Sequence, residues 1–283
     1  GAKVPFTVLS RAPDGSQLKS GHVDLAWLEV LRRVEMWRRS SRTAAVQHAR
    51  LSLHLEPRYD PQQGRKGNMP FGTVDPAKTG LVFFDALNAY FHQSAEDEKK
   101  LAPVLANDVK LRDAADQFGI PVFFAKADHR RDGLDVARVY SDTNSMLKPW
   151  DNPETDRFEP QHVVAAGEWS GEVIGELKFS DSDTLIRKNR WSAFHDTKLA
   201  LSLRTRGIDT IILAGGAIEI GIVSTAFQAR DMDFGQVIVR DACTSLENDV
   251  GDMFMEHIFP RFARIRSTDE TVEMMRAGHA RGG

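Results

Sequence analysis

Residues 205–242 read TRGIDTIILAGGAIEIGIVSTAFQARDMDFGQVIVRDA, and they predict a strand, a tight turn, a helix and a second strand. Residues 209–214 form a short isoleucine-rich run closed by two glycines, which is typical of a buried parallel strand. From Gly221 onward apolar residues recur at helical spacing, and another apolar run follows at residues 237–239. In such a unit the strand end and the first helical turn form a crevice, where free backbone N–H groups can hold an anion or a developing oxyanion. The alternative is a plain βαβ unit whose glycines serve only the turn.

Strands and helices alternate on both sides of this unit. Helices are predicted over residues 96–117, 193–206 and 247–259, with a short helix over residues 169–177 and a last helix capped by Ser267. The predicted strands cover residues 80–84, 120–125, 183–187, 209–214, 237–239 and 261–265. This alternation predicts an α/β fold, in which a parallel sheet is covered on both faces and connected by right-handed crossovers.

Composition narrows the function classes. The 283 residues are 41% hydrophobic, which is enough for one large domain or one domain with an appendage. A formal net charge of -3 gives no sign of nucleic-acid binding. No apolar stretch approaches the roughly 18 residues of a membrane span, and the N-terminus lacks the apolar core of a signal peptide. The single cysteine, Cys243, excludes an internal disulfide framework and fits a cytoplasmic protein.

Charge is unevenly distributed along the chain. Residues 1–68 carry twelve basic and six acidic side chains, so they have a formal charge of +6 and the remainder has -9. This asymmetry predicts a domain boundary between residues 68 and 69. We expect residues 1–68 to be a basic N-terminal extension that is poorly ordered or non-native, and residues 69–283 to be the main domain. A basic arm or an oligomerisation helix is the alternative for residues 1–68.

Two polar residues end apolar strands of the predicted sheet. Asp85 follows the run LVFF, and Lys188 follows the run TLIR. Since both strands should run parallel to residues 209–214, both side chains should converge on the crevice at Gly221. A carboxylate and an ammonium group held together are suited to proton transfer. The alternative is an ion pair that only joins the ends of the strands.

Three motifs around these residues resemble the isochorismatase-like hydrolases, also called the cysteine hydrolase superfamily. They are TGLVFFDALNAYF at residues 79–91, LIRKNRWSAFHDTKLALSLRTRGI at residues 185–208, and GGAIEIGIVSTAFQA at residues 215–229. The resemblance covers residues 76–270. It implies a three-layer αβα sandwich around a six-stranded parallel, Rossmann-like sheet, usually in homodimers or homotetramers. It also implies a cis peptide bond between Gly216 and Ala217.

The chain departs from the family pattern at one decisive position. Most members have a cysteine nucleophile where this chain has Gly221, in the turn that also contains Gly216, Ala217 and Ile220. Without a thiol the usual covalent route to amide cleavage is absent. Cys243 lies after the next strand, where we interpret it as a structural thiol.

Members that resemble this departure are the true isochorismatases, which have glycine at this position and hydrolyse a vinyl ether. The resemblance implies that Asp85 is the general acid, that Lys188 holds the substrate carboxylate or orients Asp85, and that Gly221 makes room for a bulkier substrate. Glu219 would bring a further negative charge near the site unless it points away. Two alternatives remain. The chain is an amide or ureide hydrolase whose cysteine has been replaced, or a catalytically silent homologue that serves in binding or assembly.

The substrate pocket and its ligands are less well defined by the sequence. Asn88 and His92 follow Asp85 closely and are candidate pocket residues, as are Tyr90 and Trp191, for which core or subunit-contact roles are the alternative. We expect a small-molecule substrate, no nucleic-acid or membrane partner, and no cofactor. The run GGAIEIG lacks the lysine and glycine spacing of a phosphate loop. No metal is expected, because the histidines at the following positions lack ligand spacing: His92, His129, His162 and His195.

Overall fold

The computed structural model describes residues 3–6, 21–24, 72–139, 142–143, 147 and 164–282. The chain divides into two compact units, Gly1–Asn68 and Met69–Gly283. In the first unit, strands β1 (Lys3–Phe6) and β2 (Gly21–Asp24) pair in antiparallel fashion. The rest of residues 1–68, on which the predicted extension depends, lies outside the described residues. The described part of the chain contains no helix with the length and apolar character of a membrane span.

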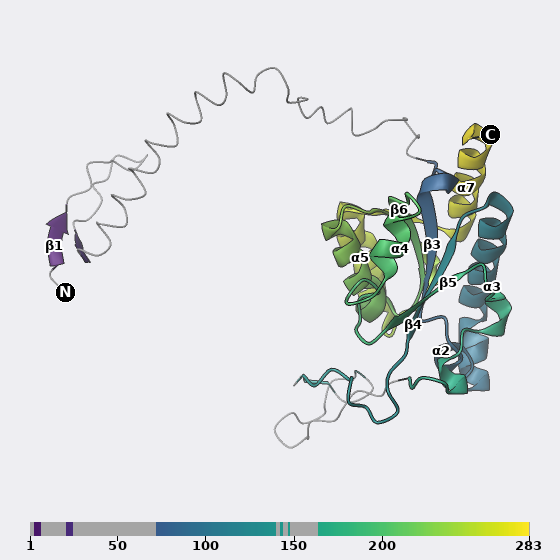
Figure 1. The fold of residues 1–283 in the computed structure, drawn as a ribbon, viewed down its shortest axis with the longest axis horizontal. Helices are drawn as coiled ribbons and strands as arrows, with labels where there is room; N and C mark the ends of the chain where they lie inside the picture. The colour runs from purple at the N-terminus through teal and green to yellow at the C-terminus, as the bar shows by residue number, and fades with distance from the viewer. Residues whose placement is uncertain are drawn as a thin grey trace. The chain divides into compact units, whose positions relative to one another are not determined.

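The second unit is built on a six-stranded sheet in which every neighbouring pair is parallel (Figure 1). The strand order is β5-β4-β3-β6-β7-β8, so the chain starts near the centre of the sheet and builds outward in both directions. This arrangement confirms the predicted parallel sheet. The strands are β3 (Thr79–Phe84), β4 (Val122–Ala127), β5 (Thr184–Lys188), β6 (Thr210–Gly215), β7 (Gly235–Cys243) and β8 (Arg264–Arg266).

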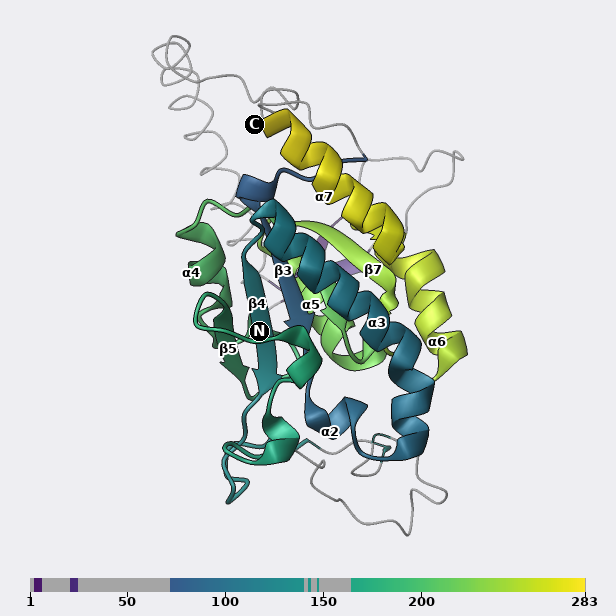
Figure 2. The same ribbon diagram turned by 90° about the vertical axis from the view of Figure 1, so that its right-hand side faces the viewer.

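Helices cover both faces of the sheet, which confirms the three-layer αβα architecture. Figure 1 shows α3 (Ala95–Phe118) and α7 (Thr268–Gly282) on one side, with α4 (Leu199–Arg204) and α5 (Val223–Asp231) on the other. Figure 2 shows α3 and α7 side by side. Because side chains alternate along β3, Leu81 and Phe83 join the core under α3 and α7, and Val82 and Phe84 join the opposite core. All six residues of β3 are therefore buried.

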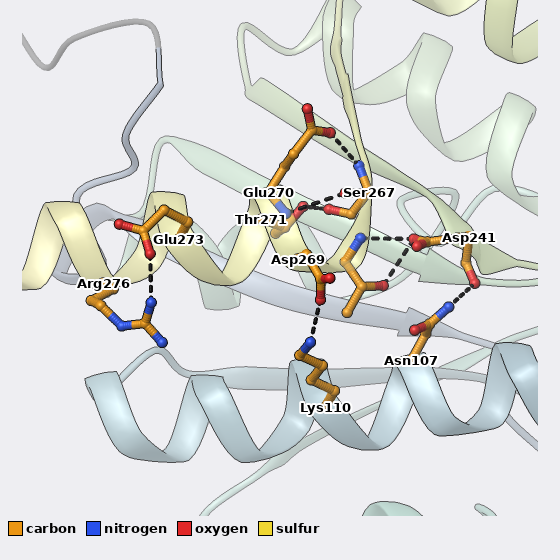
Figure 3. Close-up of polar contacts among 10 residues, drawn as sticks. Asn107, Lys110, Asp241, Ser267, Asp269, Glu270, Thr271, Glu273 and Arg276 are labelled. Atoms are coloured by element: carbon orange, nitrogen blue, oxygen red, sulfur yellow. Dashed lines mark hydrogen bonds and ion pairs between the residues drawn. The ribbon is translucent and has the colours of Figure 1, made fainter.

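The cap of α7 ties three elements together, as Figure 3 shows. Ser267 accepts a hydrogen bond at Oγ from the Glu270 N–H (3.2 Å), and Glu270 Oε2 accepts one from the Ser267 N–H (2.7 Å). This reciprocal capping box confirms the predicted cap. The Asp241 side chain, on β7, accepts hydrogen bonds from Thr268, and its carbonyl accepts one from Asn107 of α3 at 2.7 Å.

Several predicted helices are shorter or more irregular than expected. The helix predicted over residues 193–206 is wrong in its first half, since α4 begins only at Leu199. The preceding turns are stabilised by side chains, because Ala193 N–H donates to Thr225 Oγ1 (3.0 Å) and Thr197 Oγ1 donates to Ala193 O (2.6 Å). Such side-chain bonds compete with helical ones.

Two other predicted helices differ from regular α-helices. Residues 169–177 form two 3₁₀ turns, η2 (Trp169–Gly171) and η3 (Gly175–Leu177), in place of one helix. The helix predicted over residues 247–259 is confirmed as a continuous helical segment, although it changes type from α6 (Asn248–Met253) to the π-helix η5 (Phe254–Ile258) and the 3₁₀ turn η6 (Phe259–Arg261). Two further short helices are η1 (Pro76–Lys78) and α2 (Asn88–Phe91).

Candidate active site

Asp85 and Lys188 meet at the carboxyl edge of the sheet. Asp85 directly follows β3, and Lys188 is the last residue of β5, opposite Ala127 at the end of β4. Lys188 Nζ donates to Asp85 Oδ2 at 2.7 Å, and the Ala127 N–H donates to Asp85 Oδ1, also at 2.7 Å. Asp85 is 7% exposed and Lys188 is 4% exposed. The predicted convergence of the two side chains is confirmed, and the pair is nearly removed from water.

The hydrogen bonds define the form in which this pair is held. Both carboxylate oxygens of Asp85 accept hydrogen bonds, one of them from a cationic donor. Charge-assisted bonds of this kind favour a carboxylate beside an ammonium group. Removing either partner would leave a buried charge without compensation, which typically costs about 3–5 kcal/mol.

The backbone of Asp85 is itself unusual. Its φ is +46°, in the left-handed region that residues other than glycine seldom adopt. The conformation is held by two backbone hydrogen bonds, from Asp85 N–H to Ala125 O and from Leu87 N–H to Asp85 O, both at 2.8 Å. Backbone conformations of this kind are concentrated at functional sites, so the observation supports a functional role for this strand end.

The turn after β6 packs tightly against the end of β3. Gly215 has a φ of +102°, and a Cβ atom there would overlap the carbonyl oxygen of Phe84. The Gly216 N–H donates to the same oxygen at 2.9 Å. The peptide bond between Gly216 and Ala217 is cis, as the family resemblance implies. The turn is therefore fixed to the strand that presents Asp85.

Three of the N–H groups that were expected to be free at the helix start have protein acceptors. The chain enters α5 through the π-helix η4 (Ile218–Ile222), in which the Ala217 carbonyl accepts from Ile220 N–H (3.3 Å) and Gly221 N–H (3.0 Å). The Ile218 N–H donates to Thr244 O at 2.9 Å. The prediction of open donors is wrong for these three groups, because the helical turn directs two of them to the Ala217 carbonyl and the loop after β7 supplies the acceptor for the third.

Phe84 occupies the space beside Gly221. A Cβ atom built on Gly221 would overlap Cε1, Cζ and Cδ1 of the Phe84 ring, well inside the 3.0 Å separation that real Cβ atoms keep. Lys188 Nζ lies 4.1 Å from the centroid of the same ring, within the range of a cation–π interaction. The expectation that Gly221 makes room for a bulkier substrate is therefore wrong in this structure, since a core ring fills that room.

Sequence reasoning missed Phe84 as a residue of the site. Its one signal was its place directly before Asp85, but it was interpreted as part of an apolar strand. Glu219, in contrast, points away from the pair, as its carboxylate accepts hydrogen bonds from Ser245 Oγ and from the N–H groups of Leu246 (3.1 Å) and Glu247 (3.2 Å). Its charge is therefore used to hold the loop after β7.

The candidate pocket residues lie in different settings. Asn88 is buried and donates from Nδ2 to Trp169 O at 2.9 Å, which joins α2 to η2. Tyr90 is 44% exposed, and Trp191 is 48% exposed. The pKa of the Tyr90 phenol is raised, mainly by burial of its hydroxyl and to a lesser extent by the negative charge of Asp85. The phenol is therefore a neutral hydrogen-bond donor at physiological pH.

His92 belongs to a separate pocket of about 340 Å³. Its ring nitrogens lie 3.2 Å from Glu98 Oε1 and 3.3 Å from Glu176 Oε1. The other lining residues are Phe91, Leu101 and Leu105. This pocket lies along α2 and α3, and the Asp85–Lys188 pair does not line it, so the structure does not bring His92 to the pair.

Histidine and cysteine side chains were the remaining candidates for metal binding or reactivity. Within residues 72–139 and 164–282, no group of three or more His, Cys, Asp or Glu side chains is arranged to hold a metal ion. His162 lies outside the described residues. The Cys243 thiol is buried at the end of β7. Its pKa is raised, mainly by this burial and to a lesser extent by the negative charges of Asp108 and Asp241. Such a thiol is unreactive, as expected of a structural cysteine.

Comparison with known proteins agrees with this geometry. The isochorismatase domain family matches residues 79–270, about two thirds of the chain. This chain belongs to the isochorismatase family. The isochorismatase family protein YecD of Escherichia coli O157:H7 is 37% identical over 135 residues, which is 46% of this chain and 66% of YecD.

More distant relatives carry names for two activities. The ureidoacrylate amidohydrolase RutB of Acinetobacter baylyi is 29% identical over 180 residues, 59% of this chain and 71% of that protein. The probable isochorismatase of Pseudomonas chlororaphis is 25% identical over 205 residues, 72% of this chain and 90% of that protein. An isochorismatase family protein structure from Burkholderia thailandensis superimposes with a TM-score of 0.60 at 26% identity, over 72% of this chain and 98% of that one. The comparisons support a hydrolase.

Proposed function

We propose that this isochorismatase-family hydrolase acts through Asp85 and Lys188, without a covalent nucleophile at position 221. The observation that carries the proposal is the buried carboxylate–ammonium pair beside a glycine. The family resemblance aligns Gly221 with the usual cysteine, and the Phe84 ring beside it leaves no room for a side chain. The remaining chemistry is proton transfer and activation of water.

The substrate class that we propose is an enolpyruvyl-type vinyl ether. Lys188 Nζ lies 2.7 Å from Asp85 Oδ2 and stays an ammonium group, so Asp85 takes up its proton from solvent and regains it from the water that attacks. Asp85, once protonated, delivers a proton to the methylene carbon of the vinyl ether. Water then adds to the oxocarbenium carbon, and the hemiketal collapses to pyruvate and an alcohol. Lys188 holds the substrate carboxylate, and general-acid assistance of this kind typically contributes about 100-fold to 10,000-fold.

A second candidate is hydrolysis of an amide or ureide by water. It is favoured by the hydrogen bonds to both oxygens of Asp85, which hold the resting side chain as a carboxylate. A carboxylate in this setting is suited to act as a general base on water. The amidohydrolase relative of Acinetobacter baylyi supports this candidate in name.

The first experiment measures pyruvate release from isochorismate by the purified protein and by the variants Asp85→Asn and Lys188→Met. We expect turnover in the wild type and a loss of about 100-fold or more in Asp85→Asn, since the acid is removed. Asp113→Asn and Lys178→Met, an exposed pair on α3 and after η3, are matched controls and should leave turnover unchanged.

The same experiment discriminates the two candidates. Absence of pyruvate release from the wild type would exclude the vinyl ether proposal, and the protein would then be assayed against ureides and amides. Ammonia release that depends on Asp85 would establish the second candidate. Absence of turnover in both assays would favour a catalytically silent homologue.

A further inference from the structure

The ring of Phe84 and the missing side chain of Gly221 form a matched pair. Phe84 is the last residue of β3, and Gly221 lies in the turn that begins α5. The three atoms nearest to a Cβ built at Gly221 are Cε1, Cζ and Cδ1, which lie along one edge of the Phe84 ring. The space that a side chain at position 221 would occupy is therefore taken by the Phe84 ring and is not open to a substrate.

The ring is fixed in this position by its surroundings. Phe84 is 1% exposed and packs in the core under α4 and α5, with Ile218 and Ile222 of the same π-helical turn among its members. Lys188 Nζ lies 4.1 Å from the ring centroid. Because protein interiors are close-packed, moving the ring to admit a side chain at position 221 would displace these core neighbours.

We infer that Phe84 closes the covalent route in this chain and is a positioning residue for Lys188. Its ring occupies the volume that any nucleophilic side chain at position 221 would need, and it also packs against the ammonium group. The consequence for the reaction rests on the proposed function: the substrates are those that water can attack after a proton transfer. A replacement at position 221 alone would not create a cysteine hydrolase.

The packing part is tested by a double-mutant cycle on thermal stability with Gly221→Ala and Phe84→Val. Valine lacks Cδ1, Cε1 and Cζ, the atoms that a new Cβ would meet. In the protein that retains Phe84, we expect Gly221→Ala to lower the midpoint temperature of unfolding by about 5 °C or more, because overpacking a core is destabilising. In the Phe84→Val background the same change should leave the midpoint unchanged or raise it, since alanine is the better helix former.

The control is Gly175→Ala, at an exposed glycine whose added Cβ would meet nothing within 4 Å. It should show no coupling to Phe84. Equal losses from Gly221→Ala in both backgrounds would overturn the inference. If Gly221→Ala is insoluble, recovery of folded protein in the double variant supports it. Failure of all three variants, with Gly175→Ala folded, overturns it.

The effect on reactivity is tested by treating the variants with p-nitrophenyl acetate. The treated proteins are then digested, and the acetylated residues are located by mass spectrometry. In the Phe84→Val, Gly221→Cys double variant, we expect the new thiolate to attack the ester, form an acetyl thioester at residue 221 and release p-nitrophenolate. Gly221→Cys alone should carry at least tenfold less acetyl group at that residue. Equal labelling in both variants would show that the ring does not close the position.

The two proposals fail in different ways. The acetyl transfer and the stability cycle do not depend on isochorismate turnover, so they report on Phe84 even if the vinyl ether proposal is wrong. Conversely, the wild type could release pyruvate while both cysteine variants are labelled equally. That result would support the proposed function and contradict the role of Phe84. The ratio of KM to kcat for Phe84→Val gives a third readout, since a misplaced Lys188 should raise KM for a carboxylate substrate.

Discussion

Replacing Asp108 by asparagine should stabilise the protein at neutral pH. Asp108 lies on α3 and is fully buried, and within the described part of the chain neither of its carboxylate oxygens has a hydrogen-bond partner. The pKa of Asp108 is raised well above its ordinary value of 3.8, mainly by burial and to a lesser extent by the negative charge of Asp241 on β7. A buried carboxyl without partners disfavours the charged form, which explains the direction of the shift.

The sign of the pH dependence follows from the raised pKa of Asp108. In the unfolded chain the group loses its proton near the ordinary pKa of 3.8, whereas the folded state retains it to higher pH. Stability is therefore lost as the pH rises from that value toward the raised pKa, by up to about 1.4 kcal/mol per pH unit. Asparagine has nearly the same shape and does not titrate, so Asp108→Asn should lack this loss.

The assay is urea unfolding of the wild type and Asp108→Asn at several pH values between 4 and 8. We expect the stability advantage of the variant to be smallest at pH 4 and to grow with pH until it levels off. Asp113→Asn, on the same helix but exposed, should differ from the wild type by no more than about 0.5 kcal/mol at any pH. A pH-independent difference between Asp108→Asn and the wild type, or a less stable variant at pH 8, would refute the reasoning.

Three further predictions concern other parts of the fold. Cys243 should resist iodoacetamide at pH 8 until the protein is unfolded, because burial raises the pKa of its thiol; rapid labelling of the native protein would contradict this. Glu219→Ala should lower the unfolding free energy by about 0.5–1.5 kcal/mol in chemical denaturation, since it removes the acceptor of the loop N–H groups of Leu246 and Glu247; an unchanged midpoint would argue against the role of this carboxylate in the loop. Gly278→Ala should destabilise α7 although alanine favours helices, as its Cβ would overlap the Val74 carbonyl; a calorimetric midpoint above that of the wild type would show that the contact is easily relieved.

The sheet was predictable because it is parallel and covered on both faces. In such a sheet the central strands are continuous apolar runs, so the strand predicted over residues 80–84 matches β3 to within one residue. The more polar strands were located less well, because β7 extends four residues beyond the predicted residues 237–239 and β8 begins three residues after the predicted start at residue 261. The meeting of Asp85 and Lys188 followed from the same rule, since parallel strands end at one edge. The cis bond at Gly216 came from the family resemblance alone.

The irregular turns were not predictable from periodicity. The first half of the predicted helix at residues 193–206 is replaced by turns, in which Thr197 bonds to the Ala193 carbonyl that a helix would use and Thr225 accepts from the Ala193 N–H. The N–H groups of Ile220 and Gly221 are likewise satisfied by the Ala217 carbonyl through a π-helical turn, which apolar spacing does not distinguish from an α-helical one. Both outcomes depend on tertiary partners rather than on local sequence.

The interpretation of Gly221 shows why one position cannot be interpreted alone. The sequence suggested that loss of a side chain opens space for a substrate, but a close-packed interior fills such a space with whichever neighbour can reach it. Phe84 reaches it because β3 ends beside η4, and the end of its ring lies where a Cβ would be. A glycine at a nucleophile position therefore calls for a search of the adjacent strand end for a compensating large residue. Where one is present, as here, we propose that the chemistry is left to the acid–base pair and to water.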